Sequence, residues 1–264
     1  LGAPYRDRAS EFRAKMLFED LQRCGEALAE LDRVVRGDGP RSLEVERLRM
    51  RAHLASGDAE AAARALSALA ADPDSNAARI GEYGLAALAF QRGAYEAALK
   101  SFSDLAERHP ASPWANDALE AALEISSALP EGRSALDLYR AAVAARGRGE
   151  EEAAVDSLAA LERRHPGSAL VPRAVFMRAE IEAAGRPAAA EADFARVAVL
   201  FPVHDLAPRA LERLASLVEI ENAERAIEIY GSIMERYSEY PFMERVRERY
   251  VALGKGAGAA LGRG

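Results

Sequence analysis

The sequence predicts an all-α solenoid built from stacked helical hairpins, and three observations predict this fold. Half of the residues are apolar, yet only 6% are aromatic and alanine is very frequent, a composition that favours helix over sheet. A small and a large apolar residue recur four positions apart along the chain. Glycine or asparagine precedes most of these pairs, and proline ends most of the units.

The recurring pair is clearest in "QRGAYEAALKSFSDLAERHPASP" (91–113), where Ala98 and Phe102 lie one helical turn apart. The corresponding pairs are Ala27/Leu31, Ala62/Leu66, Ala154/Leu158, Ala190/Phe194 and Ala226/Tyr230. Successive alanines of these pairs are 35, 36, 56, 36 and 36 residues apart. A small residue allows two helices to cross closely, and the large residue fills the gap between them. Each unit is therefore expected to form a helical hairpin.

Turn and cap signals mark the ends of the helices. Each hairpin is expected to turn at a residue that tolerates a left-handed backbone, at Gly57, Gly93, Gly149, Gly185 and Asn222. The units are expected to end at Pro40, Pro73, Pro110, Pro166, Pro202 and Pro241. The motifs "DPDS", "HPAS" and "HPGS" place Ser75, Ser112 and Ser168 just before the next helix. We expect these serines to cap helices rather than to react.

The 56-residue step interrupts the regular spacing. Three helices are predicted in this interval, at about 113–128, 133–147 and 151–165, with Ala135/Tyr139 as a weaker pair. The middle helix either closes the hairpin before it or opens the one after it. We expect a hinge there, dividing the chain into sub-arrays at 1–128 and 129–253, followed by a flexible glycine-rich and alanine-rich tail at 254–264. About fourteen helices in about seven hairpins result, with no strand.

The stretch "LAALAFQRGAYEAALKSFSDLAERHP" (85–110) resembles a tetratricopeptide repeat, as do residues 178–202 and 214–241. The resemblance implies a right-handed superhelical solenoid that binds a protein or peptide partner. The 36-residue period and the proline–serine junction are similar to repeats of bacterial envelope proteins, such as the Tol-Pal system protein and outer-membrane assembly lipoproteins. That similarity implies a bacterial protein in the periplasm or envelope, in preference to the cytoplasm.

In the resembled family, the first helix of each hairpin lines the partner-binding groove. The positions that project inward are then Arg47, Arg51, Tyr83, Phe90, Glu120 and Glu124. The resemblance therefore implies a groove that runs from a basic rim, past two aromatic side chains, to an acidic patch. Alternatively, the aromatic side chains pack between hairpins, and the arginines pair with glutamates on a solvated helix face.

The last helix offers a second candidate surface. Phe242 and Met243 lie on a predicted helix with no further hairpin after it to cover it. Either this helix caps the array with its apolar side turned inward, or these two residues dock another subunit. An exposed pair would favour docking, and a buried pair would remove the idea.

Composition and motifs exclude most other functions. The net charge of −7 is contrary to nucleic-acid binding, a single cysteine (Cys24) allows no internal disulfide, and no apolar run is long enough to span a membrane. His109 and His165 occupy equivalent places in separate repeats, so we expect them not to converge on a metal. No catalytic motif is present. We therefore expect no enzyme activity, cofactor or metal.

The leading interpretation is a non-catalytic scaffold or adaptor that binds a partner protein along its concave face. The alternative is a regulatory or sensory module of a larger protein. Because the chain begins at Leu1 rather than methionine, we expect further sequence before it. The nature of that sequence would separate the two interpretations, and the oligomeric state stays open.

Overall fold

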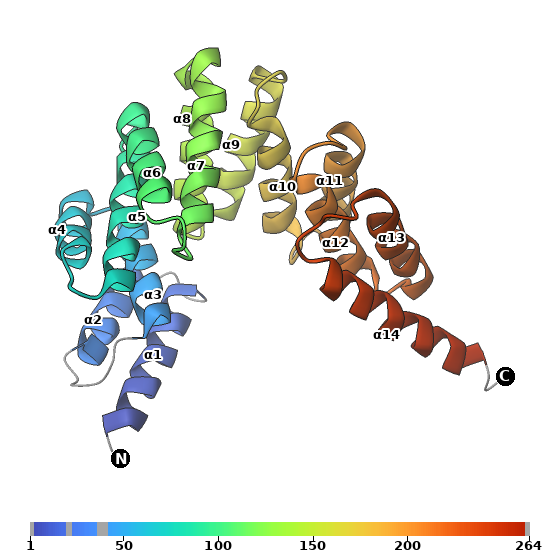
Figure 1. Cartoon of the computed structure of the whole chain (residues 1–264), viewed down its shortest axis with the longest axis horizontal. Coiled ribbons are helices and arrows are strands. Elements are labelled where there is room, and N and C mark those ends of the chain that lie inside the picture. The colour runs from blue at the N-terminus through green and yellow to red at the C-terminus, as the bar shows by residue number, and fades with distance from the viewer. Residues whose placement is uncertain (1–2, 20–22, 36–41, 262–264) are drawn as a thin grey trace. The chain divides into compact units, whose positions relative to one another are not determined.

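The computed structural model describes residues 3–19, 23–35 and 42–261. All regular structure in these ranges is helical, which confirms the predicted all-α fold and the expected number of about fourteen helices (Figure 1). The chain forms two compact units, 1–154 and 155–264. The boundary between the units falls inside one helix, Glu151–Arg164.

Unit 1 contains α1 Ala3–Glu19, α2 Cys24–Val35, α3 Leu43–Ala55, α4 Ala59–Ala70, α5 Ser75–Gln91, α6 Tyr95–Arg108, α7 Ala115–Ala128, the short 3₁₀ helix η1 Leu129–Glu131, α8 Arg133–Gly147 and the start of α9 Glu151–Arg164. Unit 2 contains the rest of α9, then α10 Val171–Glu182, α11 Pro187–Leu200, α12 Leu206–Val218, α13 Ala223–Arg236 and α14 Met243–Leu261. Neighbouring helices pack on one another within each unit, as in a helical solenoid.

The apolar pairs that predict the hairpins lie in the core. All six register alanines are 0% exposed, and their large partners, such as Phe102 and Tyr230, are buried as well. These pairs lie on the second helices α2, α4, α6, α9, α11 and α13. A methyl side chain at the crossing allows the neighbouring backbone to approach, so the large residue one turn later reaches the core.

The turn glycines behave as predicted in three hairpins. Gly57, Gly93 and Gly149 have φ angles of 78°, 72° and 73°. The prediction is wrong for Gly185 and Asn222. In the hairpin that contains Gly185, the Arg186 amide closes the turn onto the Glu182 carbonyl at 2.7 Å, and Arg186 has φ −136° and ψ 63°, outside the helical region that the following proline disfavours.

Asn222 has φ −146° and caps α13 instead of ending α12 in a left-handed conformation. Its side-chain oxygen accepts a hydrogen bond from the Arg225 amide at 3.0 Å. A short amide side chain that accepts from the first helical turn satisfies a donor that would otherwise be unpaired. Asn222 therefore marks a helix boundary at the predicted place, but it does so as the N-cap of α13.

The junctions between hairpins have a common local structure. Before α7, the hydroxyl of Ser112 accepts from the Trp114 amide at 3.2 Å. Before α10, Ser168 accepts in the same way from the Leu170 amide at 3.3 Å. Each serine therefore stabilises the turn before its helix, but the N-cap residues are Trp114 and Leu170 and carry no side-chain cap, so the prediction that these serines cap the helices is wrong.

Two junctions differ from the serine pattern. Before α5, Asp74 is the cap and accepts from the Asn76 amide at 2.8 Å, because Ser75 already lies inside the helix. Before α12, His204 Nδ1 accepts from the Leu206 amide at 3.1 Å, and the N-cap residue Asp205 makes no side-chain cap. Pro40, the first predicted stop, lies outside the described residues.

The irregular interval contains three helices, α7, α8 and α9, as predicted. The compact units divide after residue 154, and the division into sub-arrays at 128–133 stays a prediction. α14 continues to Leu261 and so includes most of the segment expected as a flexible tail. α8 contacts α3 and α5, which are the first helices of two earlier hairpins in unit 1.

Candidate partner-binding surface

Three first helices of unit 1 carry six of the residues predicted to bind a partner. These helices are α3, α5 and α7, and we call the surface that they form the first-helix face. Its two ends differ. One end is formed around Arg47, Tyr83 and Trp114, and α8 lies across the other end, at the C-termini of α3 and α5.

Trp114 is enclosed between a cation and a second aromatic ring. The guanidinium carbon of Arg47 lies 4.9 Å from the Trp114 ring centroid, and the ring centroids of Tyr83 and Trp114 are 4.9 Å apart. Tyr83 also contacts the core residue Phe102, with ring centroids 5.2 Å apart. Trp114 is therefore buried, whereas Arg47 is exposed. The stack holds an exposed cation on a rigid aromatic base.

Asp117 lies one turn beyond Trp114, next to Arg47. Partial desolvation raises the pKa of the Asp117 carboxyl, the Arg47 charge opposes that shift, and the like charge of Glu120 adds to it. Glu120 and Glu124 are half-buried on the same helix and have contacts of their own within the chain. Arg47 and Asp117 therefore lie close together, whereas the expected groove separates a basic rim from an acidic patch by two aromatic side chains.

Arg51 is engaged within unit 1. It donates to Glu19 Oε1 at 2.9 Å, and its guanidinium carbon lies 5.0 Å from the centroid of the Phe18 ring. Both contacts tie α3 to α1. This residue therefore has a structural role, although its side chain is 51% exposed.

Phe90 is part of the core of unit 1, although it was predicted to line the groove together with Tyr83. Its ring centroid lies 5.5 Å from that of Tyr95 and 6.4 Å from that of Tyr139 on α8. Only 9% of Phe90 is exposed. The two aromatic side chains therefore lie in different surroundings, and Phe90 takes the packing role that was the alternative interpretation.

Polar contacts fasten α8 to the start of α6. The Tyr95 hydroxyl donates to Asp137 Oδ1 at 2.5 Å and accepts from Arg140 Nε at 3.2 Å. Burial raises the pKa of Tyr95 to about 12, and the hydrogen bond to Asp137 acts in the same direction. Arg133 donates to both carboxylate oxygens of Glu96, at 2.6 and 2.7 Å. Sequence reasoning missed these residues, and the weaker Ala135/Tyr139 pair was the only signal for α8.

The second candidate surface, at the start of α14, is divided between core and solvent. Met243 is buried and Phe242 is 48% exposed, so the pair is neither an open patch nor a fully buried cap. Phe242 lies beside Tyr240, with centroids 5.5 Å apart, and beneath the guanidinium of Arg245. Glu212 on α12 accepts from the Tyr240 hydroxyl at 2.6 Å and from Arg245. These contacts fasten α14 to unit 2.

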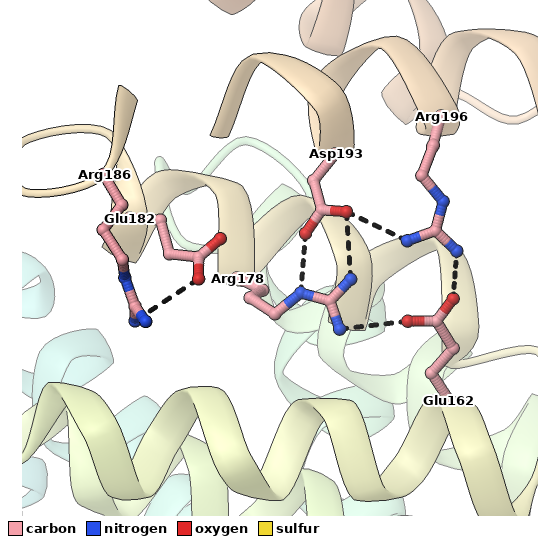
Figure 2. A network of polar contacts seen from close by, with 6 residues as sticks. All are labelled: Glu162, Arg178, Glu182, Arg186, Asp193 and Arg196. Carbon is pink, nitrogen blue, oxygen red and sulfur yellow. Dashed lines mark hydrogen bonds and ion pairs between the residues drawn. The ribbon is translucent and has the colours of Figure 1, made fainter. Parts of the chain in front are cut away.

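A polar network joins α9, α10 and α11 in unit 2. Figure 2 shows Arg178 between Asp193 and Glu162, with Arg196 bridging the same two carboxylates. Arg178 donates to Asp193 at 2.6 and 3.0 Å and to Glu162 at 3.0 Å. Each charge has a partner of opposite sign, so the network is arranged to hold helices together rather than to bind a ligand.

The ranges that the structure describes contain neither a metal-binding cluster nor a membrane-spanning helix. No group of three histidine, cysteine, aspartate or glutamate side chains in these ranges could hold a metal ion. Burial raises the pKa of the Cys24 thiol, which is the opposite of the shift that activates a nucleophile. None of the helices in these ranges has the length and apolar character required to cross a bilayer.

Comparison with known proteins agrees with the helical pairing. Residues 138–168 match the family described as tetratricopeptide repeat. The match includes part of α8 and all of α9, so it treats α8 as the helix that opens the hairpin after it. No curated protein matches the chain.

The repeat match and the paired helices together support a protein of tetratricopeptide-repeat type. Such repeats generally bind protein partners, and a fold of this kind is typically a non-catalytic scaffold. The matched family describes the repeat in general and does not distinguish envelope proteins from others.

Proposed function

We propose that this protein is a scaffold that binds a partner protein on the first-helix face of unit 1. The observation that carries the proposal is the stack of Arg47 on Trp114, with Tyr83 beneath it. Arginine, tryptophan and tyrosine dominate the binding energy of protein interfaces. Here the aromatic side chains are already packed, so binding would order little beyond the arginine.

The charges around the stack favour a partner segment that carries both signs. A carboxylate of the partner would pair with Arg47, and a basic side chain would pair with Asp117 on the neighbouring helix. Desolvation disfavours the ionised form of Asp117. An approaching cation would relieve that cost, because an opposite charge favours the ionised carboxylate.

The test is a cross-linked pull-down from the native host with the whole chain as bait. Arg47→Glu is compared with Arg64→Glu, an exposed arginine on the second helix α4 whose side chain is 73% exposed. Both substitutions reverse one surface charge, and only Arg47 belongs to the stack. A partner captured by the unchanged chain and by Arg64→Glu, but lost with Arg47→Glu, would support the proposal.

Equal capture by both variants would show that the partner binds elsewhere, and α14 would then be the next candidate. Tyr83→Ala and Phe90→Ala together are a poor probe, because Phe90 is a core residue and its loss would destabilise unit 1.

The finer proposal, that the complex belongs to the bacterial envelope, rests on the resemblance of the 36-residue period and the junction motifs. The compartment of the captured partner tests it directly. A cytoplasmic partner would remove the envelope proposal and leave the scaffold proposal intact.

A further inference from the structure

Unit 2 contains a stacked arginine of the same construction as Arg47 in unit 1. The guanidinium carbon of Arg209 on α12 lies 5.3 Å from the ring centroid of Phe176 on α10. Phe176 in turn contacts Phe194 on α11, with ring centroids 5.5 Å apart, and both rings are buried. Arg209 itself is half-buried. An arginine of one first helix therefore rests on a rigid aromatic base that reaches the core of unit 2.

The carboxylates around Arg209 are already paired with other arginines. Glu180 on α10 pairs with Arg213 at 3.3 Å. Glu212 on α12 accepts from Arg245 Nη2 at 2.8 Å. No carboxylate in the described part of the chain forms an ion pair with Arg209. Because a guanidinium that stacks through its flat face keeps its N–H donors at the edge, Arg209 has donors left for a ligand.

An exposed aromatic side chain lies next to this cation, with Tyr240 between them. Burial, and then the hydrogen bond to Glu212, raises the pKa of the Tyr240 hydroxyl, and the charge of Arg209 acts in the opposite direction. The Arg209 guanidinium therefore lies near that hydroxyl. The ring centroid of Tyr240 is 5.5 Å from that of Phe242, which is 48% exposed. We call Arg209, Tyr240 and Phe242 the Arg209 surface.

The chemistry of the Arg209 surface fits a short acidic segment of a protein. A carboxylate accepts two parallel hydrogen bonds from a guanidinium, and an apolar side chain beside it would cover the exposed ring of Phe242. The net charge of −7 repels an extended polyanion such as a nucleic acid. Only a short acidic stretch that meets the arginine directly gains from this local cation.

We propose that the Arg209 surface is a second partner-binding site, which takes an acidic protein segment with an apolar residue next to its carboxylate. This inference goes beyond the proposed function, because it assigns a separate site to unit 2. The two sites select different segments, since Arg47 lies beside the carboxyl of Asp117, whereas the carboxylates around Arg209 are already paired. Arg209 is held on Phe176 before binding, so a ligand has little of its side chain to order.

The test is a titration of the whole chain with a labelled synthetic peptide that contains two glutamates and one phenylalanine between glycines. Fluorescence anisotropy measures binding at about 0.1 M salt, where screening confines charge effects to about 10 Å. Arg209→Gln should weaken binding about tenfold, because the charged hydrogen bonds are lost. Phe242→Ala should weaken it several-fold. A peptide with glutamines in place of the glutamates should bind equally weakly to the unchanged chain and to Arg209→Gln.

Two further variants control for charge and for folding. Arg164→Gln removes an exposed arginine from the second helix α9 and should bind the peptide as the unchanged chain does. Arg209→Lys keeps the charge without the two parallel donors, so its affinity should be intermediate. Circular dichroism should show the same helix content in every variant. If the unchanged chain does not bind the peptide, or Arg209→Gln binds it equally well, the inference is wrong.

Trp114 separates this inference from the proposed function. It is the single tryptophan of the chain and lies against Arg47 in unit 1. A peptide on the Arg209 surface should leave Trp114 emission unchanged and should still bind the Arg47→Glu chain. Binding that changes this emission, and that Arg47→Glu but not Arg209→Gln abolishes, would overturn the inference and support the first-helix face instead. A pull-down unaffected by Arg47→Glu would refute the proposed function without bearing on the Arg209 titration.

Discussion

Arg178 and Asp193 form a bidentate ion pair that joins α10 to α11, with nitrogen–oxygen distances of 2.6 and 3.0 Å. Their side chains are 12% and 8% exposed, so the pair lies largely out of water. Glu162 on α9 and Arg196 on α11 complete the network in Figure 2. Removal of one partner therefore leaves a buried charge without its main counterion.

Asp193→Ala should lower the free energy of unfolding by about 3 kcal/mol or more, because Arg178 then stays buried without its bidentate carboxylate partner. Urea unfolding followed by circular dichroism measures the change. The control is Arg213→Met, which breaks the exposed pair with Glu180 and should cost no more than about 1 kcal/mol. Similar losses in the two variants would mean that burial does not determine how much these ion pairs contribute to the free energy of unfolding.

The stability of unit 2 should fall in acid because of Glu212. Burial raises the pKa of this carboxyl, but hydrogen bonds from Arg245 and Tyr240 outweigh burial, so the pKa in the folded state lies below its ordinary value of 4.5. The unfolded chain therefore takes up the proton first. The stability from Glu212 is present above pH 4.5 and is lost as the pH falls through the folded pKa.

Urea unfolding midpoints at about pH 7 and about pH 3.5 test this dependence. Glu212→Gln removes the titrating group and should show a smaller drop between the two pH values than the unchanged chain. Glu162, whose pKa is also lowered, accounts for part of the drop that remains. An identical drop in both proteins would contradict the assignment to Glu212.

Two turn glycines should respond in opposite directions to substitution. Gly93 has φ 72°, where an alanine side chain is strained, so Gly93→Ala should cost about 1 kcal/mol. Gly185 lacks a positive φ and has no atom within 4 Å of an added Cβ, so Gly185→Ala should add about 0.5 kcal/mol through the unfolded state. The melting temperature of Gly93→Ala should lie below that of the unchanged chain, and the melting temperature of Gly185→Ala should lie above it.

The crossing of α4 and α5 depends on Gly81. A Cβ at this position would lie 2.3 Å from the Ala70 amide nitrogen, so the two backbones must separate to admit it. Gly81→Ala should cost about 3 kcal/mol in a chemical denaturation experiment. Gly25→Ala is the control, since no atom lies within 4 Å of its added Cβ. If both variants unfold at the same denaturant concentration, the helices do not cross as closely as described.

Part of the candidate site could not be predicted from local pattern. The family resemblance placed Arg47, Tyr83 and Phe90 on one face, because first helices project inward at helical spacing. It could not show that Tyr139 covers Phe90, which depends on a contact 49 residues along the chain. The burial of Trp114 beneath Arg47 has the same origin, since these residues are 67 positions apart.

The sequence by itself determined the helices, the core registers and most of the turns. Helix formation and the burial of pairs such as Ala98 and Phe102 follow from residues three or four positions apart, and Gly93 stops a helix through its own backbone. Tertiary structure decided where α8 lies, which aromatic side chain stays near the surface and how closely α4 and α5 approach. These outcomes depend on which helices pack together. Contacts between segments distant in sequence determine that packing, above all in the 56-residue interval that interrupts the repeat spacing.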